Sequence, residues 1–286
     1  MQQEYINLYD EFTHGDMSRR EFMDRLTRLA GSSALAAGLV PILENNYANA
    51  QTVPPSDSRL VTESVEFDGA TGKVKAYRAR LKDKTEPMPG VIVIHENRGL
   101  NPHIEDVARR AALEGFLAVA PDALSPLGGT PKDADEARGM FGKLDYDKTV
   151  QDFVAAVKYL KSDKMCNGNV GCVGFCWGGA MANQLAVNAP DLKAAVAFYG
   201  RQPKTEDVPK IKSAVQLHYA GLDERVNEGA EAYVEALKKA NVKHEMYLYE
   251  GANHAFHNDT NAARYDAKAA RLAWERTIKF LKENLT

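Results

Sequence analysis

Cys176 stands at the centre of a Gly-x-Cys-x-Gly motif, Gly174 to Gly178, between an apolar run and a helical stretch. A strand-to-helix turn of this sharpness requires small flanking residues, because a Cβ at either glycine would meet neighbouring backbone. The turn holds its central side chain up into solvent, at a helix N-terminus whose dipole favours a thiolate. The amide of Trp177 then becomes an oxyanion donor. The motif predicts a nucleophilic cysteine, with a tight turn around a buried thiol as the alternative.

Asp223 and His254 follow this motif in the order that a nucleophile of this kind needs. Residues 217–223 supply a strand, a turn and an acid, and residues 249–254 supply a strand, a loop and a histidine. We expect His254 to deprotonate Cys176 and Asp223 to fix the tautomer of the imidazole. Taken singly, Asp223 is also explained as a helix cap and His254 as a packed imidazole. Three other histidines fit the role of base less well: His14, His218 and His257.

The elements that must position these residues alternate between strand and helix after residue 59. Two alternating runs, 60–67 and 73–80, predict an antiparallel pair of strands. The β-branched run at 90–95 is typical of a parallel strand that is covered on both faces. Further strands are expected at 115–120, 169–174, 193–199, 214–219 and 245–249, and helices at 102–114, 133–144, 147–160, 176–188, 227–240 and 262–285. This order predicts an α/β protein with a mostly parallel, doubly wound sheet and helices on both faces.

Four motifs lie along the chain from about Val61 to its end. They are Gly174-Phe-Cys176-Trp-Gly178-Gly179, Gly221-Leu-Asp223, Gly251-Ala-Asn-His254-Ala-Phe256 and His95-Glu96-Asn-Arg-Gly99. Together they resemble the dienelactone hydrolase family. The resemblance implies an α/β-hydrolase fold and a carboxymethylenebutenolidase-type hydrolase that cleaves an ester or lactone through a Cys-His-Asp triad and an acyl thioester. It also implies that Glu96 contacts and activates the resting thiol, and that the amide of Asn97 is a second oxyanion donor.

Basic residues that hold a substrate carboxylate are missing where the resemblance would place one of them. The family's founding enzymes carry an arginine shortly after the catalytic histidine, where this chain has His257 and Asn258. The predicted substrate-binding residues are therefore Arg98, Arg138 and Phe141. Dienelactone itself is not expected as the natural substrate. The alternatives are a broad-specificity esterase, a phosphoester hydrolase that uses the same triad, or a non-catalytic module that binds a small ligand.

Composition excludes several other classes of protein. The 286 residues, of which 44% are hydrophobic and 26% charged, suit one globular catalytic domain. A net charge of −3 provides no basic surface for nucleic acid. The three cysteines, Cys166, Cys172 and Cys176, are too few for a disulfide scaffold and lack the CxxC spacing of zinc sites. We therefore expect no metal and no organic cofactor, and a small ester or lactone as the binding partner.

The first 58 residues differ from the catalytic domain expected at 59–286. Ser18-Arg-Arg-Glu-Phe22 precedes an uncharged stretch from Leu29 to Leu43 and a small-residue segment at 48–50, in the manner of a twin-arginine export signal. This pattern predicts a periplasmic protein. The uncharged stretch is too short to cross a bilayer, so no stable membrane insertion is expected. The alternative is a cytoplasmic protein that keeps the segment as an amphipathic helical arm, which would pack on the domain or join two subunits in a homo-oligomer.

Overall fold

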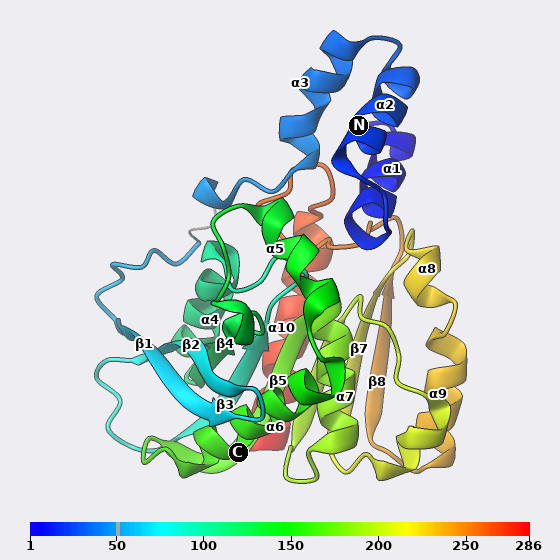
Figure 1. Ribbon diagram of the computed structural model, residues 1–286. Coiled ribbons are helices and arrows are strands. Elements are labelled where there is room, and N and C mark those ends of the chain that lie inside the picture. The colour runs from blue at the N-terminus through cyan, green and yellow to red at the C-terminus, as the bar shows by residue number, and fades with distance from the viewer. Residues whose placement is uncertain (50–51) are drawn as a thin grey trace.

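One mixed β-sheet forms the centre of the computed structural model, which describes residues 1–49 and 52–286 (Figure 1). Over these residues the sheet has eight strands in the order β1-β2-β4-β3-β5-β6-β7-β8. The strands are β1 (Leu60–Gly69), β2 (Gly72–Leu81), β3 (Met88–Ile94), β4 (Leu117–Pro121), β5 (Cys166–Phe175), β6 (Ala194–Phe198), β7 (Ala214–Ala220) and β8 (His244–Tyr249). β1, β2 and β4 pair in antiparallel fashion and all other neighbours are parallel, so the predicted sheet is confirmed.

Helices cover both faces of this sheet, as the alternating order predicts. They are α4 (Pro102–Leu113), α5 (Ala134–Met140), α6 (Tyr146–Ser162), α7 (Trp177–Asn188), α8 (Glu224–Asn227), α9 (Ala230–Lys239) and α10 (Ala267–Leu285). α6, α7 and α9 contribute to one apolar core, and α4 and α10 contribute to the other. In β3, Ile92 and Ile94 pack into the first core, and Val91 and Val93 into the second. Each such side chain contributes roughly 1.5–3 kcal/mol through burial, which explains the continuous apolar run.

Two predicted helices differ from the observed ones. The last helix begins at Ala267 rather than at residue 262, because the Asp266 side chain caps it by accepting from the amides of Lys268 and Ala269. The preceding residues form turns that bind the N-terminal segment instead. There the Asn261 side-chain amide donates to the Leu43 carbonyl. The helix expected at 227–240 begins at Ala230 as α9, and a separate short helix, α8, ends at Asn227.

The N-terminal segment folds into three helices, α1 (Gln3–His14), α2 (Arg19–Ala30) and α3 (Ser33–Leu43), which sit on one end of the catalytic domain (Figure 1). Phe12, Phe22 and Leu26 are buried in a small core of their own, with the two phenyl rings stacked 4.6 Å apart. These helices have the form that the alternative of an amphipathic arm describes. In the described part of the chain no single helix is long and apolar enough to cross a membrane, although α2 and α3, bent by 115°, pass that test as a pair.

His218, in the middle of β7, gives the fold a predicted sensitivity to acid. Its ring is fully buried and bonds to Tyr249, Gln216 and Thr277. Burial, and then repulsion by Arg276, lowers the pKa of His218 to about 3. The unfolded chain therefore binds a proton between about pH 6.5 and pH 3 that the folded chain excludes, and stability falls by up to about 1.4 kcal/mol per pH unit as pH drops through this window.

The measurement is the free energy of unfolding in urea at pH 7.5, 6 and 5. We expect a His218→Gln variant to lose less stability over this range than the parent protein, whatever its stability at pH 7.5. His244→Gln, at the partly buried start of β8, is the matched control and should keep the parent slope. Equal slopes for His218→Gln and the parent would contradict the prediction.

Candidate functional site

Cys176 lies at the turn between β5 and α7, in a strained backbone conformation with φ 56° and ψ −114°. Few non-glycine residues adopt such a conformation, so the surrounding structure must hold it in place. The Cys176 amide donates to the Phe198 carbonyl at 3.0 Å. A Cβ on Gly174 would lie 1.9 Å from the Gly178 carbonyl oxygen, and one on Gly178 would lie 2.4 Å from the Ile94 oxygen. The two glycines are required for the sharp turn, as the motif predicts.

Asp223 and His254 meet at the same edge of the sheet, next to this turn. Asp223 follows β7 and caps α8, and His254 lies in the loop after β8. The His254 Nδ1 atom is 2.5 Å from an Asp223 carboxylate oxygen, and both side chains are buried. Burial raises the pKa of Asp223, but the His254 ring and then Arg225 outweigh it, so the net pKa is below its usual value. The carboxylate is therefore positioned to hold one tautomer of the imidazole.

The other ring nitrogen of His254 faces the thiol without bonding to it. Nε2 of His254 is buried and has no hydrogen-bond partner among residues 1–49 and 52–286. A ring nitrogen of His254 lies within 4.8 Å of the Cys176 sulfur. The structure therefore brings the three predicted residues together, but the hydrogen bond between the Cys176 sulfur and the His254 ring is not formed.

His14, at the end of α1, occupies the place beside the sulfur instead. Its Nε2 atom lies 3.1 Å from Cys176 Sγ, and its ring stands edge-on to the His254 ring at 4.5 Å. Its Nδ1 atom lies 2.9 Å from the Asp10 carbonyl oxygen and 3.2 Å from an Asp10 carboxylate oxygen. From the sequence His14 belongs to the N-terminal arm and fits the role of base less well than His254, but the structure places it against the thiol. No local pattern marks it, because its importance depends on how α1 docks on a domain that begins far along the chain.

Charges around His14 favour its protonated form. Burial lowers the pKa of the ring, but attraction to Cys176 and hydrogen bonds to Asp10 and Cys176 outweigh burial and repulsion by His254, and the net pKa is raised. Burial likewise raises the pKa of Asp10, yet His254, His14 and Arg264 bring it well below its usual range. Asp10 therefore stays charged behind the imidazole.

Polar contacts fasten α1 over the site. The Asn97 side-chain amide donates to the Thr13 carbonyl at 2.8 Å. Arg138 donates to the Phe12 carbonyl at 3.0 Å, and its guanidinium lies 4.5 Å from the centre of the Phe12 ring. At the other end of the helix, Gln3 donates to Asn253 at 2.5 Å. The N-terminal segment thus forms one wall of the site.

A cavity of about 330 Å³ remains beside the thiol. Its lining includes Thr13, His14, Arg138, Phe141, Cys176, Trp177, Tyr199, Arg201, Arg225 and His254. Arg138 Nε and two nitrogens of Arg225 are buried without a hydrogen-bond partner in the described chain. Carboxylates of Asp10 and Asp135 lie 3.7 Å from Arg225 and 4.0 Å from Arg138, too far for hydrogen bonds. Cationic donors without a hydrogen-bond partner at a cavity wall are suited to an anionic ligand.

Arg201 and Arg225 were missed by the sequence analysis, although both follow strands of the parallel sheet. Arg201 comes after β6, and Arg225 lies in α8 after β7. Their places at carboxyl ends of strands were a signal that could have found them.

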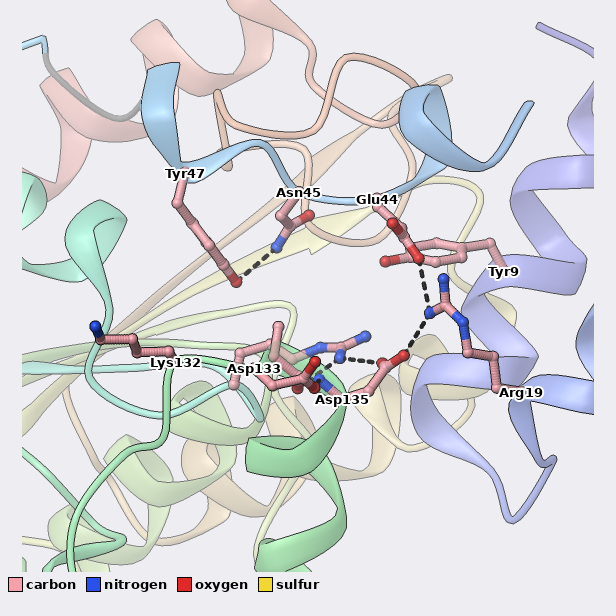
Figure 2. Close-up of a pocket in the computed structure, with 10 residues that line it drawn as sticks. Tyr9, Arg19, Glu44, Asn45, Tyr47, Lys132, Asp133 and Asp135 are labelled. Carbon is pink, nitrogen blue, oxygen red and sulfur yellow. Dashed lines mark hydrogen bonds and ion pairs between the residues drawn. The ribbon is translucent and has the colours of Figure 1, made fainter. Parts of the chain in front are cut away.

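Arg98 and Glu96 lie near the thiol but are engaged elsewhere. Arg98 donates to Asp135 at 2.6 Å and does not line the cavity of about 330 Å³. It borders a larger cavity of about 600 Å³ between the N-terminal segment and the domain, where Arg19 pairs with Glu44 and Asp135 (Figure 2). Glu96 accepts from the Asn258 side chain at 2.7 Å. No hydrogen bond joins Glu96 to the thiol within the described residues, so the predicted contact is not made in this state.

Comparison with known proteins identifies the family of the catalytic domain. Residues 74–285 match the model described as "Dienelactone hydrolase family". The chain belongs to the dienelactone hydrolase family. It is 32% identical over 246 residues to an Escherichia coli O157:H7 protein named "Putative carboxymethylenebutenolidase", with 81% of this chain and 90% of that relative covered. It is 36% identical over 234 residues to "Protein usf" of Aquifex pyrophilus, with 78% and 99% covered.

A solved structure agrees with this assignment. A dienelactone hydrolase-like promiscuous phosphotriesterase from metagenomic libraries superposes with a TM-score of 0.71 at 26% identity, over 80% of this chain and all of that one. The predicted fold of this dienelactone hydrolase family member is therefore confirmed. Residues 1–31 match a different model, described as "YqhI-like". The helix that carries His14 thus has relatives of its own, outside the hydrolase match.

Proposed function

We propose that this member of the dienelactone hydrolase family hydrolyses a carboxylic ester or lactone with Cys176 as nucleophile, His254 as base and Asp223 as partner of the base. The observation that carries the proposal is the buried hydrogen bond between Asp223 and His254. The other ring nitrogen of His254, Nε2, has no hydrogen-bond partner in the described chain and is available to the thiol of Cys176, which lies on a strained turn. A nucleophile, a base and an acid in this relation are the components of acyl transfer.

In the proposed mechanism, His254 Nε2 takes the thiol proton and the Cys176 sulfur attacks the carbonyl carbon. The amides of Trp177 and Asn97 hold the oxyanion, and removal of one such donor costs roughly 3 kcal/mol. The intermediate collapses to an acyl thioester as the alcohol leaves with the proton from His254. A water molecule deprotonated by His254 then attacks the thioester, releasing the acid and restoring the thiol. The first step requires the sulfur to turn from His14 toward His254.

We infer further that the substrate carries a carboxylate. Arg138, Arg201 and Arg225 line the cavity beside Cys176, and nitrogens of Arg138 and Arg225 lack hydrogen-bond partners in the part of the chain that the structure describes. These arginines come from positions other than the one after the catalytic histidine, so the absence of a basic residue there does not leave the cavity neutral. A cavity of about 330 Å³ suits a small ester or lactone.

The test compares an aryl hemiester of a dicarboxylic acid with a neutral aryl ester of the same length. We expect Arg201→Gln to raise KM for the hemiester by roughly tenfold, because a hydrogen bond to a charged group contributes about 1.5–3 kcal/mol, and to leave KM for the neutral ester nearly unchanged. Arg271→Gln, on the exposed face of α10, is the control. A parallel rise for both esters would argue against a carboxylate subsite.

A phosphoester substrate is the second candidate, favoured by the likeness to the solved structure named a promiscuous phosphotriesterase. The same thiolate and base would attack phosphorus in place of carbon. An aryl phosphotriester in the substrate panel tests this, and we expect it to be cleaved more slowly than the aryl esters.

We propose export to the periplasm as the destination of the chain, on the basis of the Ser18-Arg-Arg-Glu-Phe22 pattern. The segment 48–50 supplies the expected cleavage site, of which Ala50 lies outside the described residues. Cleavage there would remove His14, so the contact of His14 with the thiol belongs to the chain that retains the arm. N-terminal sequencing of the periplasmic protein distinguishes cleavage from retention of the arm. A homo-oligomer through the arm stays a prediction, and sedimentation of the full chain measures it.

A further inference from the structure

We propose that His14 Nε2, Cys176 Sγ and His254 Nε2 form a binding site for one zinc ion, which holds the N-terminal segment closed over the thiol. The three ligands come from the end of α1, the turn after β5 and the loop after β8. Their ligand atoms all lie within 4.8 Å of one another, and the closest pair is 3.1 Å apart. Around a tetrahedral zinc ion with bonds of 2.0–2.3 Å, ligand atoms stand about 3.5 Å apart. Small side-chain rotations therefore complete the site.

Each histidine of this site is backed by a carboxylate. Asp10 contacts Nδ1 of His14, and Asp223 contacts Nδ1 of His254. Histidines that bind metal commonly donate their second nitrogen to a carboxylate, which fixes the tautomer and turns Nε2 toward the ion. In this chain both imidazoles have that arrangement, although they belong to segments about 240 residues apart in sequence.

Unpartnered polar atoms and a small space lie between the ligands. His254 Nε2 and Glu96 Oε1 are buried and lack hydrogen-bond partners within the described residues. Both residues line a cavity of about 10 Å³ together with His14 and Cys176. This volume suits a single ion or water molecule. Glu96 is not among the residues whose ligand atoms lie within 4.8 Å of one another, so a water molecule would supply the fourth ligand.

The kind of ligands selects zinc over other common cations. One thiolate and two imidazoles are soft or borderline donors, which favour zinc over magnesium or calcium. Of the three cysteines only Cys176 belongs to this site, and Cys172 is buried in the first apolar core instead.

Zinc in this site would inhibit the hydrolase, since the ion binds both the sulfur and the nitrogen that the reaction needs. The inhibition rests on the proposed function, whereas zinc binding does not. The thiol then becomes available only when zinc is withdrawn or α1 leaves the domain.

The test is zinc binding to the metal-free full-length protein, measured by competition with a chromophoric chelator. We expect one zinc ion per chain, and a loss of about 100-fold or more in affinity for His14→Asn. His244→Asn, which changes a histidine outside the site, is the matched control and should bind as the parent does. Unchanged affinity of His14→Asn would overturn the proposal.

Cobalt(II) gives a second readout that does not depend on any His14 variant. Bound to the parent protein, it should show a thiolate-to-cobalt charge-transfer band and the visible bands of a tetrahedral ion, and Cys176→Ala should lose the former. Absence of the thiolate band in the parent protein would also overturn the proposal. Ester hydrolysis is assayed separately on the metal-free chain. A chain that binds zinc but hydrolyses nothing contradicts the proposed function alone, and an active chain without zinc affinity contradicts this inference alone.

Discussion

Replacing Cys176 by Ala is expected to lower kcat/KM for a simple aryl ester by about 10⁴-fold or more, because the group that forms the bond to the acyl carbon is removed. The thermal midpoint should change little, since the turn is held by Gly174, Gly178 and the bond from the residue 176 amide to Phe198 rather than by the sulfur. The measurement is steady-state hydrolysis of the metal-free protein beside a thermal unfolding curve.

Cys166→Ala is the matched control, because this cysteine is also buried but lies at the start of β5, away from Asp223 and His254. It should hydrolyse the ester at the parent rate. An active Cys176→Ala protein would remove the thiol from the mechanism, and loss of activity in both variants would point to damage of the strand.

Replacing Asp223 by Asn is expected to reduce kcat by about 10⁴-fold at neutral pH, because an amide no longer fixes the imidazole in the tautomer that accepts the thiol proton. The fold should persist, since Asn caps a helix as well as Asp does and α8 begins at this residue. Steady-state kinetics and circular dichroism together separate the chemical loss from unfolding.

Asp191→Asn provides the control for this change. Its carboxylate is largely exposed and pairs with Lys161, on the surface. We expect parent activity for it. A fall of less than tenfold for Asp223→Asn would mean that the hydrogen bond to His254 contributes only to packing.

The turn that carries Cys176 and the two side chains that meet beside it could be predicted from sequence because each depends on local features. The glycines around Cys176 are needed because a Cβ would clash with the backbone of that turn, which is a local requirement. Asp223 and His254 follow strands of a parallel sheet, and residues that follow parallel strands lie at the same edge of the sheet. The alternating burial of β3 is equally local, so the fold class could be predicted as well.

His14 could not be found in this way. The place of His14 depends on the contacts of Thr13 and Phe12 with Asn97 and Arg138, which join residues more than 80 positions apart. No pattern of residue spacing in the sequence predicts how α1 docks on the domain. Arg201 and Arg225 follow β6 and β7, so their places after parallel strands could have marked them, whereas no such signal marks His14.

The contact between His14 and Cys176 has a practical consequence for anyone who prepares this enzyme. Leader-like sequences are routinely removed before expression. A chain that begins at β1 would lack the His14 imidazole and the Asp10 carboxylate that lie beside the Cys176 sulfur in the full-length protein. Kinetic constants from trimmed and untrimmed preparations would then describe two different reaction centres.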